Sequence, residues 1–531
     1  MRRGRSHTLV PMEAPRRFIT GIFRLILVVG IAGCGPRQQG SQVEITGAGR
    51  TSEAVAHARA DRAKVPLRLD PSNPHYFFFR GQPTVLVGST EHYGAVINGD
   101  FNYVTYLDEL ARSHLNLTRT WVGSYLEVRS DYNPAKSAYA IDLNTLAPRP
   151  ERYLCPWPRS GVPGAADGLS KFDLARCDPN YFSRLKDFLQ EAGKRGIVAE
   201  LNLFCSFYTD DLWNASPMNP RNNVNLTGNI PRNEVYALRH ADLLRVQDSM
   251  VREIVRAARE FDNVYFEICN EPYYGGVSPE WQRHISNVVV ETEKPFRYRH
   301  LIAQNTASGS EVIEDPDPDV AICNFHYSRP PDSVAMNYRL NRAIGVNETG
   351  FDGQADAIYR VQGWDFLVAG GALYNNLDFS FAVGHERGDF LYKGYTPGGG
   401  SAALRKQLGV LQSFLQALPL ISMRPENSII KGGVPAEASA RVLASRGKVY
   451  VIYIHHGHVR KNAQPQYAVD ASPHQLALAL ELPPGSYDAA WLIPQTGTIN
   501  KRERFIHAGE VRTLASPVYS EDVALLIQAT Q

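Results

Sequence analysis

The chain has 531 residues, more than one ordinary domain needs, and its 44% hydrophobic content suffices for a barrel-sized core with a smaller second core. Its 56 Lys and Arg residues nearly balance 54 Asp and Glu, which leaves a formal net charge of +2. No basic stripe continues beyond the N-terminal segment, so the composition argues against nucleic acid as a partner. The six cysteines form no CxxC motif and therefore show no metal-ligand spacing.

The N-terminal segment 1–34 is predicted to direct export. Arg16 and Arg17 precede a mostly apolar run over 18–33, which leads into Ile31-Ala32-Gly33-Cys34. This ending resembles the lipobox of bacterial lipoproteins, and the resemblance implies a lipid on Cys34 that anchors the chain in the cell envelope, periplasmic or at the cell surface. The alternatives are an uncleaved anchor or an ordinary signal peptide and a secreted protein. Residues 35–64 are polar and are predicted to form a flexible tether.

Between residues 65 and 424, short apolar or β-branched runs alternate with longer segments of helical period, such as Tyr181–Arg195 and Leu243–Phe261. No glycine-rich phosphate loop follows the first run, which argues against a nucleotide-binding doubly wound sheet. The number of runs favours an α/β fold of the (β/α)8 TIM-barrel class. The eight predicted strands are Thr84–Ser89, Asn116–Trp121, Ile197–Phe204, Asn263–Asn270, Leu301–Gln304, Ala321–His326, Ala343–Glu348 and Ala372–Phe379.

Residues 425–531 have a different pattern and are predicted to form a small antiparallel β-sandwich domain. Short alternating runs are separated by Gly, Pro and Asn turns, and no segment has a clear helical period. The runs are Ala440–Ala444, Lys448–Ile454, Leu476–Leu482, Tyr487–Leu492 and Asp522–Ile527.

Cysteine placement leaves one disulfide open. Cys155 and Cys177 flank a loop rich in Pro and Gly, and an oxidising compartment would allow them to pair. Cys205, Cys269 and Cys323 lie in or beside apolar runs and are predicted to be buried free thiols.

Two predicted strands end on glutamates. Pro272 prevents the strand that ends in Asn270-Glu271 from continuing, and a second strand ends in Asn347-Glu348. The carboxyl ends of barrel strands build the open face of such a fold, so both carboxylates are expected there. The simpler alternatives are a helix-start carboxylate for Glu271 and an ordinary turn for Glu348.

An Asn-Glu-Pro ending on the fourth strand and a Glu ending on the seventh resemble the family 5-like retaining glycoside hydrolases, over roughly Leu67 to Leu418. The resemblance implies that Glu271 is the general acid/base and Glu348 the nucleophile. It also implies that Arg119 orients the nucleophile, that Asn270 holds the sugar 2-hydroxyl and that His326 and Tyr327 close the sixth strand. The substrate would be a β-linked oligo- or polysaccharide, and no metal or organic cofactor is required.

The expected mechanism requires different protonation states for the two carboxyl groups. The neighbouring negative charge and partial burial are expected to raise the pKa of Glu271, while Arg119 keeps Glu348 ionised. His92, Trp121 and Tyr374 are further candidates for contact with the sugar.

The sugar-contacting positions differ from the family pattern. Glu200, Asn202 and Phe204 stand where many relatives have a third-strand His, and 374–379 lack the eighth-strand Trp. These differences leave the substrate open. The alternative functions are a non-catalytic carbohydrate-binding lipoprotein, an adhesion protein that acts through the C-terminal domain, and an inverting hydrolase on the same barrel. Its segment Pro484–Trp491 resembles β modules appended to several barrel glycosidases, some of which are named collagen-binding domains.

Overall fold

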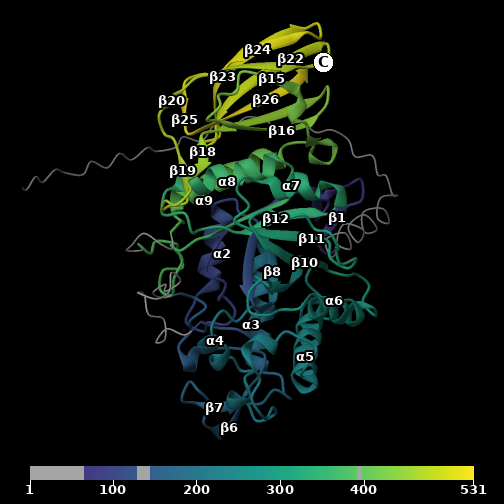
Figure 1. Ribbon diagram of the computed structural model, residues 1–531, viewed down its shortest axis with the longest axis vertical. Coiled ribbons are helices and arrows are strands. Elements are labelled where there is room, and N and C mark those ends of the chain that lie inside the picture. Colours follow the sequence, from purple (N-terminus) through teal and green to yellow (C-terminus); the bar gives the residue numbers. More distant parts are fainter. Residues whose placement is uncertain (1–64, 128–143, 392–397, 531) are drawn as a thin grey trace, which may run out of the picture. The chain divides into compact units, whose positions relative to one another are not determined.

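A computed structural model describes residues 65–127, 144–391 and 398–530. The predicted export segment, the tether and Cys34 lie outside the described residues. Eight parallel strands form one sheet in the order β4-β13-β12-β11-β10-β9-β8-β5, which confirms the predicted barrel and its eight strands (Figure 1). Their bounds are β4 Leu86–Thr90, β5 Leu117–Trp121, β8 Val198–Cys205, β9 Val264–Asn270, β10 Leu301–Ser308, β11 Ile322–His326, β12 Ala343–Glu348 and β13 Leu373–Leu377.

One asparagine joins the two ends of this sheet. The Asn116 amide N–H donates to the Val87 carbonyl at 3.1 Å, and the Asn116 side chain accepts from the Val87 N–H at 2.8 Å. The same side chain donates to the Val85 carbonyl at 2.9 Å. Asn116 therefore replaces part of the strand ladder between β4 and β5 and closes the barrel.

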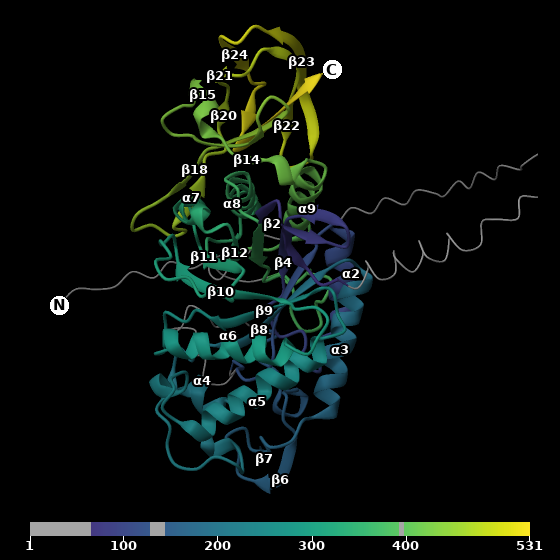
Figure 2. The ribbon, with the colours of Figure 1, turned by 90° about the vertical axis from the view of Figure 1, so that its right-hand side faces the viewer.

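The helices that cover the barrel begin at recognisable caps. Asp178, Ser278 and Ser401 each accept a backbone N–H at a helix start. The two predicted helices are confirmed as α3 and α5, and α5 lies beside α6 (Figure 2). The helices are α2 Tyr103–Arg112, α3 Pro179–Lys194, α4 Asp210–Ala215, α5 Ala241–Ala258, α6 Pro279–Glu293, α7 Asp332–Asn337, α8 Asp356–Val368 and α9 Ala402–Gln416.

The barrel interior has an apolar lower layer and a polar upper layer. A β-hairpin sheet, β1 Arg68–Asp70, β2 Asn73–Phe79 and β3 Gln82–Thr84, contributes Phe77 to the lower layer, next to strand residues such as Leu117 and Ile322. Above them, Gly345 leaves room for the Asn324 side chain, because an added Cβ would lie 2.4 Å from its Oδ1 atom. The polar layer comprises Arg119, Glu200, Glu267, Asn324, Asn347 and Asn375.

The two largest antiparallel sheets of the C-terminal region have the orders β14-β16-β17-β26-β22-β23 and β15-β21-β24. Two short pairs accompany them, β18 Gly457–Val459 with β19 Tyr467–Val469 and β20 Pro473–His474 with β25 Tyr519–Ser520. The five predicted strands are confirmed as β16, β17, β21, β22 and β26. The other strands were not predicted, among them the long β23, which carries Lys501 to Arg504 in place of apolar residues. The bounds are β14 Arg424–Pro425, β15 Ile430–Gly432, β16 Ser439–Ser445, β17 Val449–His455, β21 Ala477–Glu481, β22 Gly485–Ile493, β23 Thr498–His507, β24 Val511–Ala515 and β26 Asp522–Thr530.

Helix α8 connects the barrel to the β domain. Trp364 stacks on Tyr453 of β17, with ring centroids 5.4 Å apart. Arg360 donates to Asp522 at 2.9 Å and to Glu521 at 2.7 Å. Because these groups are largely buried, the contact ties the barrel and the β domain into one compact unit.

Cys155 and Cys177 are free thiols, so the disulfide considered above is not formed. Cys155 is buried with its sulfur near the Trp157 carbonyl, whereas Cys177 is exposed. Cys205, Cys269 and Cys323 are buried free thiols, as predicted. Within the described part of the chain, no helix has the length and apolar character needed to span a membrane.

Replacing Arg360 by Ala is expected to destabilise the folded chain. The substitution leaves the fully buried Asp522 carboxylate without its counter-ion, which costs about 3–5 kcal/mol of unfolding free energy. Thermal denaturation followed by circular dichroism measures the effect. The matched control is Arg245→Ala, because the pair of Arg245 with Asp242 is exposed and contributes about 1 kcal/mol or less. Equal melting temperatures for the two variants would contradict the structural role of Arg360.

Candidate active site

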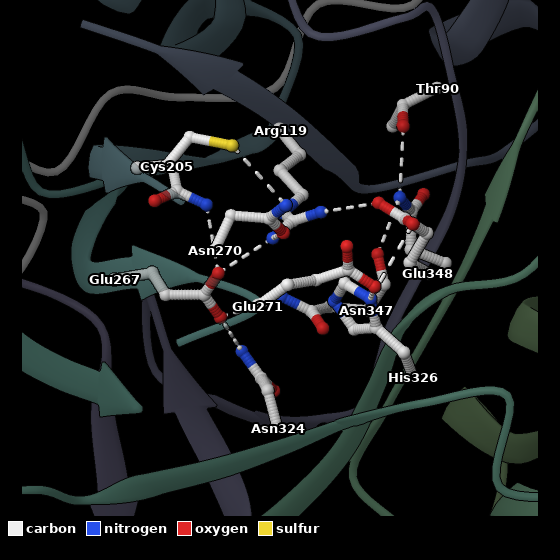
Figure 3. A network of polar contacts seen from close by, with 12 residues as sticks. Thr90, Arg119, Cys205, Glu267, Asn270, Glu271, Asn324, His326, Asn347 and Glu348 are labelled. Atoms are coloured by element: carbon white, nitrogen blue, oxygen red, sulfur yellow. Dashed lines mark hydrogen bonds and ion pairs between the residues drawn. The ribbon is translucent and has the colours of Figure 1, made fainter. Parts of the chain in front are cut away.

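Glu271 follows β9, Glu348 ends β12, and their side chains point toward each other with His326 between them (Figure 3). The His326 Nδ1 atom lies 3.1 Å from Glu271 Oε1 and 3.4 Å from Glu348 Oε1. One ring nitrogen of His326 and one carboxylate oxygen of each glutamate all lie within 4.8 Å of one another. The two predicted carboxylates therefore share one site, although the sequence places them on strands far apart in the chain.

Three residues at this site have left-handed backbone conformations: Tyr93 (φ 59°), Glu271 (φ 47°) and Tyr327 (φ 52°). Such values are uncommon outside glycine and cost about 1–3 kcal/mol each when the surroundings enforce them. The turn at Tyr327 breaks the alternation of β11. His326 and Tyr327 consequently both reach the carboxylate pair, although neighbouring residues of a regular strand face opposite sides.

Glu348 is held through both of its oxygens. Arg119 donates from Nη1 to Oε2 at 3.0 Å, and the Tyr327 hydroxyl donates to Oε1 at 2.5 Å. Hydrogen bonds to an ionised acceptor are short and strong, so these two donors stabilise the negative charge and fix the orientation of the carboxylate.

Glu271 accepts from Tyr208 at 2.7 Å and from Tyr273 at 3.1 Å, besides its contact with His326. Burial opposes its ionisation, but the hydrogen bond and charge of His326 outweigh burial and lower the pKa of Glu271. The expectation of a raised pKa was therefore wrong. Burial in turn disfavours the charged form of His326, but the negative charges of Glu348 and Glu271 prevail and raise the pKa of His326. The two shifts together favour a protonated imidazole beside an ionised Glu271.

Arg119 is fully buried below the carboxylate pair. It donates from Nε to Glu200 and from Nη2 to Glu267, both at 2.6 Å, and the Asn270 side chain accepts a further bond at 2.8 Å. Its guanidinium carbon lies 4.7 Å from the Tyr93 ring centroid and 4.6 Å from that of Trp121. This set of contacts fixes the guanidinium that holds Glu348.

A cavity of about 460 Å³ opens above the carboxylate pair. This volume lies within the range of small-molecule sites in proteins. Of the residues predicted from the sequence, Glu271, Glu348, Asn270, Tyr327, Trp121 and His92 line it, while Arg119 and His326 support the carboxylates from below and from the side. The other lining residues are Tyr93, Tyr125, Glu127, Leu146, Cys205, Tyr208, Arg232, Tyr274, Gly275, Phe351 and Leu377.

Tyr374 does not line this cavity, contrary to the prediction. Its hydroxyl donates to the Tyr359 carbonyl of α8 at 2.8 Å, and its ring packs against Gly363 of the same helix. The side chain therefore belongs to the outer face of β13. Near the end of β13, Leu377 and Phe351 form an apolar wall of the cavity.

Three functional side chains were missed in the sequence. Tyr208 bonds both Glu271 and Asn270, and its only signal is its position three residues beyond β8. Glu267 points into the barrel from β9. Its signal in the sequence is a charged residue within an otherwise mostly apolar strand. Glu127 lines the cavity beside His92, and its Oε1 atom lies 3.5 Å from His92 Nε2.

Among the described residues, Glu271, His326 and Glu348 are the group whose donor atoms could hold a metal ion. Two features disfavour a divalent cation there. The raised pKa of His326 favours the protonated ring, which has no free lone pair for a metal at Nδ1, and the Arg119 guanidinium already lies 3.0 Å from Glu348. A metal ion would have to displace the proton of His326 and lie close to the positive charge of Arg119.

Comparisons with known proteins agree with the fold. Residues 136–247 match the family model described as "Domain of unknown function (DUF6298)", which spans less than half of the chain. A solved structure described as a glycoside hydrolase shares 12% identity with a TM-score of 0.56, covering 88% of this chain and 97% of its own. A glycoside hydrolase family 5 structure from Bacteroides vulgatus ATCC 8482 also shares 12% identity with a TM-score of 0.56, covering 88% and 94%. No curated protein sequence matches. The chain thus shares the fold of these hydrolases.

Glu200→Gln is expected to change how stability depends on pH. Burial, followed by the charge of Glu267, raises the pKa of Glu200 from 4.5 to about 7. In the unfolded chain the carboxyl loses its proton near pH 4.5, so its ionisation favours unfolding increasingly between pH 4.5 and pH 7. The wild type should lose stability relative to Glu200→Gln between pH 5 and pH 8.

Melting temperatures of both proteins at the two pH values test this expectation. The control is the exposed Glu510→Gln, whose difference from the wild type should not change with pH. A constant difference between Glu200→Gln and the wild type would show that Glu200 does not retain its proton in the folded state.

Proposed function

We propose that this protein is a retaining glycoside hydrolase of β-linked glycosides or polysaccharides, with Glu271 as general acid/base and Glu348 as nucleophile. The observation that carries the proposal is the closeness of the two carboxylates. One oxygen of Glu271 and one of Glu348 lie within 4.8 Å of each other, and both residues line the same cavity. Retaining enzymes separate these groups by about 5–5.5 Å and inverting enzymes by about 6.5–9.5 Å, because inversion needs room for a water molecule. The fold shared with solved glycoside hydrolases supports the same assignment.

In the first step, a Glu348 oxygen attacks the anomeric carbon while the bond to the leaving oxygen breaks. Glu271 transfers its proton to that oxygen, so the leaving group departs as a neutral alcohol. Arg119 and Tyr327 fix the attacking carboxylate without adding a covalent bond. The sugar then remains on Glu348 as an ester.

In the second step, Glu271 removes a proton from water, and the resulting oxygen attacks the anomeric carbon from the side of the departed group. The ester bond to Glu348 breaks, and the carboxylate is restored. Two inversions give net retention of configuration.

His326 stores the proton that Glu271 needs. The imidazole bonds Glu271 at 3.1 Å, and the raised pKa of His326 favours the protonated ring in the free enzyme. Transfer along this contact supplies Glu271 with the acidic proton when substrate displaces water from the cavity. The pair therefore titrates as a unit rather than as two independent groups.

In the same proposal, a lipid on Cys34 anchors the enzyme in the bacterial cell envelope. The segment Ile31-Ala32-Gly33-Cys34 after an apolar run supports this location.

Activity against a panel of nitrophenyl β-glucoside, β-mannoside, β-galactoside and β-xyloside and the corresponding hexasaccharides tests the function. Glu348→Ala should reduce kcat by about 10³-fold or more, since it removes the group that forms the intermediate. Glu271→Ala should cost about 10²–10⁴-fold, and less with a dinitrophenyl leaving group that needs no protonation. The control is the exposed Glu280→Gln on α6, which should behave like the wild type.

Product stereochemistry separates this mechanism from its alternatives. Proton NMR during turnover should show the β-anomer first. Initial release of the α-anomer would rule out retention, and undiminished activity of Glu348→Ala would rule out this nucleophile. Sugar binding without turnover by the wild type would instead identify a carbohydrate-binding protein.

The alkaline limb of the kcat/KM profile should move to lower pH in His326→Gln. In the wild type this limb reports loss of the proton shared by His326 and Glu271, which the raised pKa of His326 places above 6.5. Without the imidazole, Glu271 alone must retain the proton. The exposed His458→Gln in the β domain serves as control, and an unchanged limb in His326→Gln would show that His326 does not store the catalytic proton.

A further inference from the structure

A second hollow of about 770 Å³ adjoins the catalytic cavity, and Arg232 lines both. We call it the amide hollow after four of its lining residues, Asn214, Asn219, Asn229 and Asn233. It is built by α4 and by the segment 219–233, which follow β8 in the chain. Nothing in the two-step mechanism uses it.

The lining of the amide hollow suits sugar hydroxyl groups. Side-chain amides offer both donors and acceptors, as hydroxyl groups do, and the guanidinium of Arg221 adds further donors. The side chains of Arg221 and Asn229 are exposed and form no hydrogen bond or ion pair with another described residue. Their bonding capacity is therefore available to a ligand.

The amide hollow lies on the Glu271 side of the carboxylate pair. Arg232 donates from Nη1 to the Phe207 carbonyl at 2.6 Å, and Tyr208, the next residue, bonds Glu271 at 2.7 Å. The loop after Glu271 packs directly against the same segment, because an added Cβ on Gly276 would lie 2.5 Å from the Asn233 carbonyl oxygen. The wall of the hollow and the loop of Glu271 are thus in contact.

The opposite end of the cavity belongs to Glu348. Phe351 follows Glu348 in the chain, Leu377 ends the adjacent strand β13, and both line the cavity. The general acid must face the leaving oxygen, and the nucleophile must face the anomeric carbon. The attacked sugar therefore lies toward Glu348, and the leaving group lies toward Glu271, Arg232 and the amide hollow.

We infer that the amide hollow binds further sugar units of the leaving group, so that the enzyme prefers oligo- and polysaccharide chains that continue for several units on the leaving-group side of the cleaved bond. This inference rests on the proposed function. The chain passes from the carboxylate pair over Tyr274 and Arg232, where the half-exposed Tyr274 ring offers a face for stacking. Arg232 is held in place by Asp210 at 3.1 Å, so it forms a fixed border between the two spaces.

The double variant Arg221→Ala/Asn229→Ala tests the inference. Its kcat/KM on the hexasaccharide that the wild type hydrolyses should fall by about tenfold or more, because one to two hydrogen bonds to the leaving chain are lost. Its kcat/KM on the nitrophenyl glycoside of the same sugar should not change, since that leaving group is too short to reach the amide hollow. The exposed Arg446→Ala in the β domain is the matched control, and melting temperatures verify folding.

Hexasaccharides labelled at the reducing end give a second measurement. The wild type should release labelled products of several units, and the double variant should shift cleavage toward shorter labelled products. Equal kcat/KM values of wild type and variant on the hexasaccharide, or release of only single labelled sugars by the wild type, would overturn the inference. If the wild type hydrolyses neither type of substrate, the proposed function itself fails.

Discussion

The site depends on one buried cation. Arg119 is inaccessible to solvent and is paired with Glu200 of β8, Glu267 of β9 and Glu348 of β12, so its guanidinium links four of the eight strands. Removing one partner of a buried ion pair costs about 3–5 kcal/mol, because the remaining charge loses its compensation. The polar layer of the barrel is therefore a coupled unit, and its geometry sets the orientation of Glu348.

Charge balance around Arg119 determines where the protons reside. The guanidinium contacts three carboxylates. A fourth, Glu271, lines the catalytic cavity together with Glu348. A single cation cannot stabilise four negative charges in a buried site, so protons are retained by neighbouring groups. Burial, followed by the charge of Glu267, raises the pKa of Glu200, whereas the charges of Glu348 and Glu271 raise the pKa of His326 against its burial. The hydrogen bond and charge of His326 in turn outweigh burial at Glu271 and lower its pKa.

Much of the fold was readable from the sequence because barrel strands are short apolar runs with polar residues at their ends. The positions of Glu271 and Glu348 followed from the strand ends, and the strand count placed them at one mouth. The pKa of Glu271 was not predictable in this way, since it depends on His326 from a strand that is not adjacent to β9. Tyr374 was misplaced because facing alternates along β13, and the inward residue is its neighbour Asn375, which bonds Asn347 inside the barrel.

At the position where the family pattern has a third-strand His, this site uses a tyrosine from the segment that follows the strand. The expected third-strand His is absent, but Tyr208, just beyond that strand, donates to Glu271 at 2.7 Å and accepts from Asn270 at 2.9 Å. The hydroxyl therefore ties the proposed acid/base to the residue expected to hold the sugar 2-hydroxyl. The segment that continues from Tyr208 also builds the amide hollow. In the proposed mechanism the leaving group lies on this side, so the segment that supports Glu271 is also proposed to select the leaving group.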